Sequence, residues 1–511
     1  MLALDSNIII DAAAAISFII LIVFLDRRSR YRLPLPPGPP RPFLSDNRRD
    51  VPVASPWKTF TAWQKEYGDV VSIQLGCTPV IILNSIKAAI DLLEKRGNIY
   101  SSRPRHIVGG EIYSGGMRGI GMPYGQRWRN WRLLMNTGMG VEASQGYKPL
   151  QDSESKIMLR DLLNAKSSSE RSSFVRRFVI SVVFFVSYGR RISSMEVPTI
   201  QMNEEIEHFI ISVPGKHLVE SRSLQWFRWK YDKQRERETK FYLELMESVR
   251  ERMAENTAHA CTSTKGLEKQ EQFGMSDVEL AYGLSSPGQA GVGTNYAAFH
   301  VFLSMFMAML LNPTAMKRAQ EEIDSVIGHG RLPEFSDMES LPYVHALITE
   351  VLRWKPIVPT ALAHSVIVDD VYEDMFIPKG STIYANIHAM CLDEEVFPEP
   401  KKFLPERFLA PTDPRLANFT LSFGFGRRIC PGIHTVRQSL FITIARILWA
   451  FDIRPPTGPS GEPILPDDED FSTGLVIHPK PFEYNMVPRR DGIIEFLNEE
   501  ARKADEEVLV W

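Results

Sequence analysis

Cysteine is scarce in this sequence, and neither sign of charge dominates it. The four cysteines are widely spaced and form no CxxC pair, which argues against a disulfide framework or a cysteine-based zinc site and indicates a reducing compartment. Lysine and arginine number 59 against 62 acidic residues, and this net charge of −3 gives no case for nucleic-acid binding. No internal repeat is visible. The 511 residues, 44% of them hydrophobic, therefore describe a globular chain of one large or two ordinary domains.

An apolar run near the N-terminus has the length needed to cross a bilayer. Residues 8–25, interrupted by Asp11, would span about 27 Å as a helix. Four arginines between residues 27 and 32 follow the run, and no lysine or arginine precedes it, so the positive-inside bias keeps the rest of the chain in the cytosol. A cleaved signal peptide carries its positive charge before the apolar core, so an uncleaved anchor fits better.

We divide the chain on this basis into four parts. Residues 1–26 are expected to form a membrane anchor, and residues 27–45 a basic and proline-rich hinge that stays extended. Residues 46–490 are expected to form one large domain. Residues 491–511 form a charged, helix-prone tail for which the sequence indicates no function.

Helical periodicity dominates this large domain. Apolar spacing predicts helices over residues 57–67, 86–94, 174–188, 226–252, 315–327, 341–354 and 436–450, and strands over 70–75, 80–83, 365–368 and 377–387. Polar composition predicts a loop over 256–275, and the glycines predict an irregular segment over 103–125. Residues 280–311 form a long apolar segment that polar residues interrupt, so we do not expect a second membrane span there. The prediction is a mainly α fold with a small β region.

Residues 423–432, with the sequence FGFGRRICPG, carry the most distinctive chemistry. Glycines 424 and 426 permit a tight backbone and the close approach of a flat ligand. Cys430 lies just before a predicted helix, where backbone N–H groups and the dipole stabilise a thiolate. Arg428 adds a fixed cation that could bind a carboxylate. A thiolate held this way is a ligand for a metal or haem iron, whereas the simpler interpretation is a structural cysteine at a loop-to-helix junction.

The spacing Phe-x-x-Gly-x-Arg-x-Cys-x-Gly resembles the haem-ligand loop of the cytochrome P450 superfamily. Its fixed positions here are Phe423, Gly426, Arg428, Cys430 and Gly432. The resemblance implies the P450 fold, with a long central helix over the haem and the cysteine loop below it. It also implies haem b as the cofactor, with Cys430 as the axial ligand of the iron. The texture of the sequence is similar to that of fungal, basidiomycete-like microsomal members of specialised metabolism.

Two further elements resemble the family's contacts to the haem propionates. Trp128 and Arg132 fall four apart on one face of a predicted helix, and a guanidinium binds a carboxylate bidentately. His364 follows Lys355-Pro356 at the place where the family puts a histidine or arginine on the second propionate. Without the resemblance, these residues would be a surface arginine packed on tryptophan and an ordinary polar histidine.

A third pair of motifs implies a buried structural triad behind the haem. Glu350 and Arg353 form an ExxR pair on one helix face, and Arg407 lies in the sequence Pro-Glu-Arg-Phe, which resembles the family's partner motif. An isolated ExxR on the surface would be worth only about 0–1 kcal/mol. If the triad is desolvated, removing one partner costs roughly 3–5 kcal/mol because an unpaired buried charge remains.

The central segment contains Ala290, Gly291 and Thr294, which resemble the residues that leave room for dioxygen and hydrogen-bond it. The acid that usually precedes the threonine is replaced here by Gly293. Apolar residues are expected to line the substrate pocket and to select a lipophilic molecule. These pocket candidates are Ile107, Val108, Ile357, Val358, Ala361 and Leu475.

The resemblance implies a haem-thiolate monooxygenase that takes electrons from NADPH-cytochrome P450 reductase and uses O2. Its substrate would be a lipophilic secondary metabolite with a terpenoid, indole or polyketide scaffold. The enzyme would be a single-pass protein of the endoplasmic reticulum membrane with its catalytic domain in the cytosol. Gly293 keeps open an alternative, a haem-thiolate isomerase, dehydratase or rearranging enzyme that does not activate O2. A haem-binding sensor or a membrane-tethered scaffold is a third interpretation.

Overall fold

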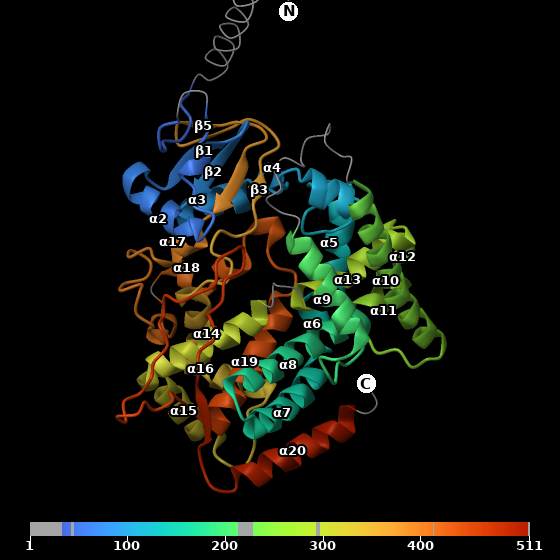
Figure 1. Cartoon of the computed structure of the whole chain (residues 1–511), viewed down its shortest axis with the longest axis vertical. Coiled ribbons are helices and arrows are strands. Elements are labelled where there is room, and N and C mark those ends of the chain that lie inside the picture. The colour runs from blue at the N-terminus through green and yellow to red at the C-terminus, as the bar shows by residue number, and fades with distance from the viewer. Residues whose placement is uncertain (1–32, 42–44, 213–227, 293–296, 412, 509–511) are drawn as a thin grey trace, which may run out of the picture.

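Helices form most of the molecule (Figure 1). The strands before residue 390 gather near one end of it, whereas the strand pair of residues 451–454 and 485–488 lies among the helices. The structure is a computed structural model that describes residues 33–41, 45–212, 228–292, 297–411 and 413–508. The predicted anchor at residues 1–26 lies outside these ranges. The mainly α fold with a small β region is confirmed.

The α-helices are distributed along the whole of the described chain. Their bounds are α2 Pro56–Tyr67, α3 Ile86–Ala89, α4 Gly97–Tyr100, α5 Gln126–Met139, α6 Val141–Gln145, α7 Lys148–Asn164, α8 Ser168–Tyr188, α9 Pro198–Ser212, α10 Arg228–Ala254, α11 Thr262–Glu268, α12 Gln270–Phe273, α13 Asp277–Val292, α14 Ala297–Leu311, α15 Pro313–Ile327, α16 Pro342–Trp354, α17 Ile387–Cys391, α18 Pro414–Ala417, α19 Ile433–Ala450 and α20 Ile493–Val508. Shorter 3₁₀ or π turns are η1 Asn47–Arg49, η2 Ile90–Lys95, η3 Ile107–Tyr113, η6 Phe335–Ser340, η7 Pro405–Phe408, η8 Leu421–Phe423 and η9 Gly426–Arg428.

The strands form one larger sheet and two pairs. Their bounds are β1 Val70–Leu75, β2 Thr78–Leu83, β3 His364–Ser365, β4 Asp370–Tyr372, β5 Met375–Ile377, β6 Thr382–Ala385, β7 Phe451–Arg454 and β8 Asn485–Pro488. The larger sheet has the order β1-β2-β6-β3, with β1 and β2 antiparallel and β2 parallel to β6. This sheet joins the start of the domain to the segment after α16, so residues near 100 and near 365 become neighbours through a bridge between Ser102 and Ser365.

The core is built around the helices that flank the cysteine loop. Helix α19 is buried along nearly its whole length and packs on α7, α15 and α16. Helix α13 packs on α8 and α10, and α14 packs on α16 and α8. Burial of these faces supplies the hydrophobic stabilisation that holds the loop at residues 423–432 in place.

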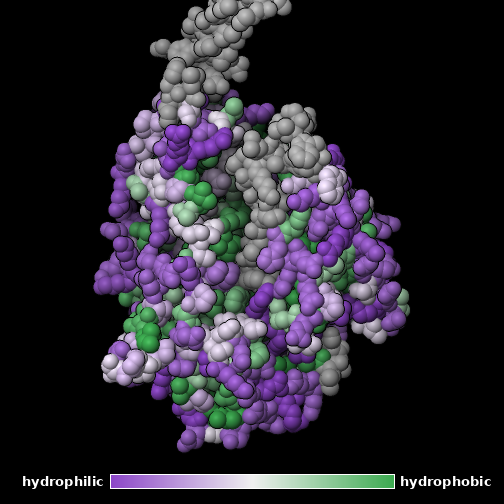
Figure 2. Space-filling model, in the orientation of Figure 1, coloured by the Kyte–Doolittle hydropathy of each residue, from purple (hydrophilic) through white to green (hydrophobic). Residues whose placement is uncertain are grey.

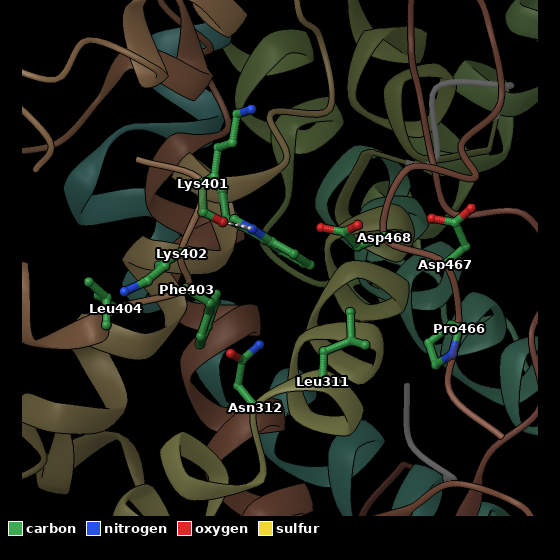
Figure 3. A pocket seen from close by; sticks show the side chains of 10 residues that line it. Leu311, Asn312, Lys401, Lys402, Phe403, Leu404, Pro466, Asp467 and Asp468 are labelled. Carbon is green, nitrogen blue, oxygen red and sulfur yellow. Dashed lines mark hydrogen bonds between the residues drawn. The ribbon is translucent and has the colours of Figure 1, made fainter. Parts of the chain in front are cut away.

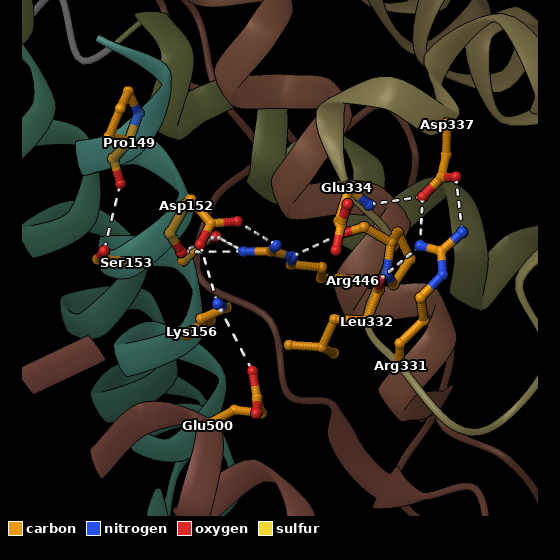
Figure 4. A network of polar contacts seen from close by, with 12 residues as sticks. Pro149, Asp152, Ser153, Lys156, Arg331, Leu332, Glu334, Asp337, Arg446 and Glu500 are labelled. Carbon is orange, nitrogen blue, oxygen red and sulfur yellow. Dashed lines mark hydrogen bonds and ion pairs between the residues drawn. The ribbon is translucent and has the colours of Figure 1, made fainter. Parts of the chain in front are cut away.

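The C-terminal tail is a helix that packs against the catalytic domain. Helix α20 lies along α7, and its own residues Leu497, Ala501 and Ala504 are buried. A polar network next to this contact continues from α20 through α7 to α19, because Lys156 pairs with Glu500 at 3.5 Å and with Asp152 at 3.0 Å, and Asp152 pairs in turn with Arg446 (Figure 4).

Three predictions of local structure were wrong. The strand expected over 365–368 is limited to β3, His364–Ser365, and residues 366–368 form no strand. The expected loop at 256–275 contains α11 and α12, because Cys261 and Thr264 form a capping box and the short residues of α11 pack on α5. The strand expected over 377–387 is interrupted: β5 ends at Ile377, Gly380 turns with φ 81°, and β6 ends at Ala385 before α17 begins. The strands at 70–83 are confirmed, although their turn is only Gly76-Cys77.

Within the described residues, no single helix has both the length and the apolar composition to cross a membrane. Helices α14 and α15 would satisfy both conditions only together, and they meet at a bend of 105°. The space-filling view shows that one face of the molecule is hollowed between the strand-bearing part and the helical part, with hydrophobic residues visible in the hollow (Figure 2).

Candidate functional site

The loop that carries Cys430 is a tight backbone structure between η8 and α19. Gly424 and Gly426 adopt φ values of 84° and 51°, which side chains other than glycine rarely allow. A Cβ on Gly426 would lie 2.3 Å from the carbonyl oxygen of Leu93, so this glycine also permits close backbone contact with η2. The N–H of Cys430 donates to the carbonyl of Phe423 at 2.9 Å and closes the loop. The local sequence therefore fixes the direction of the cysteine.

Cys430 is half-buried as a residue, and the surrounding protein desolvates its thiol. Burial raises the pKa of the Cys430 thiol, and the N–H of Gly432 and the charge of Arg132 only partly offset that effect. The sequence analysis expected backbone N–H groups at the helix start to stabilise the thiolate. The N–H of Gly432 does lower the pKa of Cys430, but burial raises it by more, so the net pKa lies above its ordinary value. A bound metal cation would supply the missing charge and deprotonate the thiol.

A cluster of arginines lies beside this loop without acidic partners. Arg132 donates to the carbonyl of Ile429 at 2.6 Å, while Arg103 donates to the carbonyls of Leu362 and Ala363 at 2.7 Å. Burial and the nearby charges of Arg103 and Arg132 lower the pKa of Arg428 to about 9, and burial lowers that of Arg103 to about 10. In the described part of the chain, none of these three cations forms an ion pair with a carboxylate. Such a cluster fits an anionic ligand.

Trp128 and Arg428 lie in direct contact inside this cluster. The guanidinium carbon of Arg428 is 4.3 Å from the centroid of the Trp128 ring, a cation–π contact. The indole Nε1–H of Trp128 is buried and has no hydrogen-bond partner among the described residues. A buried donor without a partner costs free energy, so this position fits an acceptor oxygen supplied by a ligand.

His364 closes the same region from strand β3. Its Nδ1 lies 2.9 Å from the carbonyl oxygen of Tyr100, so Nδ1 carries the proton and donates it. Burial lowers the pKa of His364 to about 3, with the charge of Arg103 adding to the effect. The imidazole is therefore neutral beside the arginines, and a carboxylate placed next to it would favour its charged form.

These groups together fit a flat cofactor that carries a metal and two carboxylates. Cys430 offers a sulfur ligand, whereas Trp128, Arg132, Arg428 and Arg103 offer donors and positive charge on adjoining elements. Haem has this combination of iron and propionates. The residues present therefore fit the haem that the sequence motifs imply.

Comparison with known proteins agrees with this interpretation. The sequence profile of the family Cytochrome P450 matches residues 36–486. The chain belongs to the cytochrome P450 family. Cytochrome P450 monooxygenase 58 of Postia placenta is 36% identical over 481 residues, which are 91% of this chain and 90% of that protein. Echilunin cytochrome P450 monooxygenase of Aspergillus ruber is 36% identical and the monooxygenase FrzL of Cladobotryum sp is 35% identical, over 94% of this chain and 91% and 92% of theirs.

A solved structure shows the same fold. A zebra fish cytochrome P450, determined with abiraterone, superposes with a TM-score of 0.69 at 22% identity and covers 85% of this chain and 100% of its own. The protein is thus a cytochrome P450 monooxygenase, and its cofactor is haem held by a cysteine thiolate. P450 enzymes use O2 and a redox partner and act on lipophilic substrates.

The P450 triad residues lie together, and two of them, Glu350 and Arg353, are fully buried while the side chain of Arg407 keeps 6% of its surface exposed. Arg353 donates to both carboxylate oxygens of Glu350 at 2.7 Å, and Arg407 approaches the same carboxylate at 3.3 Å. Glu350 and Arg353 have no exposed side-chain surface. The N–H of Leu404 also donates to Glu350 at 2.8 Å, which ties the segment before η7 to α16. The hydroxyl of Ser422 donates to the carbonyl of Leu352 at 2.7 Å and so links α16 to the start of the cysteine loop.

The residues predicted on the oxygen-binding side are only partly described. Ala290 and Gly291 lie near the end of α13, where Ala290 is exposed and the residues just before it are buried or half-buried. Thr294 and Gly293 lie outside the described residues. Trp131 of α5 donates to the hydroxyl of Ser286 at 3.1 Å and holds α13 against α5.

The predicted pocket residues fall into two groups. Val108 is buried with Ile107 packed beside it, in a cluster that includes Tyr113 and Tyr231. Ile357, Val358 and Ala361 belong to the turn after α16, and the N–H of Ile477 donates to the carbonyl of Ile357 at 2.8 Å. This bond brings the loop of Leu475 to the same turn, although Leu475 itself is exposed.

A separate cleft opens near the C-terminal ends of α14 and α16 (Figure 3). Lys401 and Lys402 lie on one side of it and Asp467 and Asp468 on the other, and Trp354 donates to the carbonyl of Lys401 at 3.1 Å. None of the predicted site residues lines this cleft.

Arg103 was missed by the sequence analysis. It lies in the sequence Ser-Ser-Arg-Pro at the start of an irregular segment, and no local pattern marks it. Its position depends on tertiary structure. The bridge between Ser102 and Ser365 places Arg103 next to the turn before β3, and Arg428 donates to the carbonyl of Ser101 in the same segment.

Proposed function

We propose that this P450 takes electrons one at a time from NADPH-cytochrome P450 reductase and uses O2 to hydroxylate or otherwise oxidise a lipophilic secondary metabolite. The observation that carries the proposal is the desolvated sulfur of Cys430 beside a buried cluster of arginines that lack acidic partners. The similarity to fungal P450 monooxygenases over more than nine tenths of the chain supports the same class of reaction.

Each residue of the site has a definite task in this proposal. Cys430 ligates the iron, and Trp128, Arg132, His364 and Arg428 hold the propionates, with Arg103 as an added donor. When bound, the haem supplies the oxygen chemistry, which the thiolate ligand tunes by donating electron density. Glu350, Arg353 and Arg407 keep the cysteine loop rigid beneath it.

Protons and substrate are handled on the other face. The small residues Ala290 and Gly291 of α13 leave room for O2. Thr294 supplies a hydroxyl that passes or holds a proton. Ordered water takes the place of the acidic side chain that the family usually has at the position of Gly293. The apolar turn at Ile357 and Ala361 provides a wall for a terpenoid, indole or polyketide scaffold.

A carbon monoxide difference spectrum tests the cysteine. The reduced, CO-treated protein should show the Soret band of a thiolate-ligated haem, and Cys430→Ala should abolish it. Cys77→Ala is the matched control because Cys77 is exposed, and it should leave the band intact. A band that persists in Cys430→Ala would rule out this ligand.

Reconstituted turnover tests the electron donor and the substrate class. The protein is combined with NADPH and the reductase and is offered terpenoid, indole and polyketide metabolites, with products read by mass spectrometry. We expect products that gain one oxygen atom and that disappear when either NADPH or the reductase is left out. The isomerase, dehydratase or rearrangement alternative receives no support from the relatives, which are monooxygenases, and turnover without both components would be needed to revive it.

We also propose that residues 8–25 anchor the enzyme in the endoplasmic reticulum membrane with the catalytic domain in the cytosol. The support is the apolar run and the four arginines that follow it. Full-length protein should stay with microsomes after carbonate extraction, whereas a variant lacking residues 1–26 should be released. Protease added to intact microsomes should degrade the catalytic domain, and protection of that domain would contradict the orientation.

A further inference from the structure

Residues 103–125, which we call the roof segment, are fixed on one side to the cysteine loop. Arg428 donates to the carbonyl oxygens of Gly119 and Met122 at 3.3 and 2.6 Å. Arg103 donates to the carbonyl of Ile120 at 3.1 Å from within the segment. The later part of the roof segment is therefore held by the same arginines that lie beside Cys430.

The other side of the roof segment is fixed by Arg118. Its guanidinium donates to Glu238 of α10 at 2.8 Å and to the side-chain oxygen of Gln289 of α13 at 2.6 Å. The hydroxyl of Tyr113 donates to the second carboxylate oxygen of Glu238. Arg235 of α10 adds a bond to the carbonyl of Ile112 at 3.0 Å. One arginine of the roof segment thus joins two long helices.

The contact is buried and depends on charge. The side chain of Glu238 is fully buried and that of Arg118 is only 13% exposed. Glu238 accepts from Arg118 at one carboxylate oxygen and from Tyr113 at the other. Removing Arg118 would leave that carboxylate buried without a cation, so the contact is made or broken as a unit.

The side of the contact at α13 is incompletely satisfied. Because the oxygen of Gln289 accepts from Arg118, its amide nitrogen faces away, and this nitrogen is buried without a partner among the described residues. The Nε of Arg118 is in the same condition. Unsatisfied donors reduce the stability of the closed arrangement, and Gln289 lies directly before the exposed Ala290 near the end of α13.

We propose that Arg118, Glu238 and Gln289 form a latch that holds the roof segment closed against α10 and α13, and that ligands enter and leave this side of α13 when the latch opens. The proposal rests on the proposed function only in taking this side as the substrate side. Arg118 acts as a positioning residue, because its contacts are to protein groups. The apolar packing of Val108 and Ile112 on Tyr231 keeps the start of the roof segment attached when the latch opens.

Ligand-binding kinetics and hydrogen exchange test the latch. Haem-loaded wild type, Arg118→Met, Glu238→Gln and the double variant are mixed with 4-phenylimidazole, and the change in haem absorbance is followed by stopped flow. We expect roughly ten-fold faster association and dissociation in each single variant, with less change in Kd. Amide exchange within residues 103–125 should rise in parallel. The double variant should open no further than the single ones, because the pair acts as a unit.

Arg250→Met is the matched control. Arg250 lies on α10, like Glu238, but its closest ion pair is with Glu247 of the same helix, so its loss should leave both rates and exchange unchanged. Unchanged rates and exchange in Arg118→Met would overturn the latch. If Arg118→Met fails to retain haem, Glu238→Gln carries the test, and wild-type rates and exchange in that variant would equally overturn the proposal. The exchange readout needs no turnover, so failure of the proposed oxidation is distinguishable from failure of the latch.

Discussion

At the scale of single residues, the side chain of Glu350 is buried and is held by hydrogen bonds from three other residues. Its two oxygens accept hydrogen bonds from Arg353, Arg407 and the backbone of Leu404, with no exposure to water. All of these donors need an acceptor oxygen. The carboxylate of Glu350 offers two, whereas the amide of a glutamine at this position would offer only one.

Glu350→Gln should therefore lower the free energy of unfolding by about 3–5 kcal/mol, because two buried arginines lose their counter-charge. Urea denaturation of the wild type and the variant measures the difference. Glu406→Gln is the control, since its pair with Arg318 is about half exposed and should contribute about 0–1 kcal/mol. Equal losses in the two variants would contradict the assignment of a desolvated triad.

Glu207 of α9 predicts a dependence of stability on pH. Burial raises the pKa of Glu207 to about 7, the charge of Arg118 works against this shift, and that of Glu238 adds to it. The folded state thus binds a proton more tightly than the unfolded state, whose carboxyl has a pKa near 4.3. The resulting stabilisation is complete below that value and is lost as the pH rises through about 7.

We expect wild-type stability to fall by about 3 kcal/mol more than that of Glu207→Gln between pH 4.5 and 8. Denaturant titrations at several pH values measure this difference. Glu205→Gln is the control, because Glu205 is 57% exposed and paired with Arg237, so this variant should follow the wild-type profile. Parallel profiles for Glu207→Gln and the wild type would show that Glu207 titrates as in the unfolded chain.

At the scale of elements, the sequence predicted what local periodicity determines. Helices α2, α15, α16 and α19 begin and end within a few residues of their predicted bounds, because each has an apolar face of regular spacing. Helix α11 was missed because its short polar residues are buried by neighbours from α5, a tertiary effect that overrides composition.

The residues of the candidate site also fall into those that local sequence determines and those that tertiary contacts determine. The glycines and Cys430 of the loop are contiguous in the sequence, so the spacing alone was informative. Arg103 and the bonds of Arg118 depend on which distant segments meet, and residues from four separate elements carry no shared pattern before folding. Local chemistry could be predicted, whereas the partners of isolated charges could not.

Helix α20 is an element that lies beyond the part of the chain matched by the P450 family. It contacts α7 through an apolar face, and α7 reaches the cysteine-loop helix because Gln151 donates to Ser439 of α19 at 2.9 Å. The helix therefore stabilises the packing beneath the site from a distance.

Leu497→Ala should lower the free energy of unfolding by about 2–4 kcal/mol, because Leu497 is buried in the main core and its loss leaves a cavity. Thermal or urea denaturation measures the change. Ile494→Ala is the control on the same helix, where Ile494 is 46% exposed and should lose less than about 1 kcal/mol. A small effect at Leu497 would mean that α20 docks without contributing to stability.

At the scale of the whole molecule, Arg428 connects the two faces of the site. It lies two residues before Cys430, and it donates to the carbonyls of Ser101, Gly119 and Met122 while its guanidinium stacks on Trp128. The roof segment on one side and the cysteine loop on the other are thus held by one planar group. Movement of the roof segment therefore changes the surroundings of the arginine that we propose holds a haem propionate.

Arg428→Lys should weaken both faces together, because an ammonium group cannot match the three directions of a guanidinium fork. We expect a loss of about 2–4 kcal/mol as buried carbonyls lose their donor, faster transfer of haem to apomyoglobin, and more hydrogen exchange at residues 119–122. Arg427→Lys is the neighbouring control, since Arg427 is exposed and should leave all three measurements near wild type. Faster haem loss without added exchange would separate the two faces, and the roof segment would then be held from the α10 side alone.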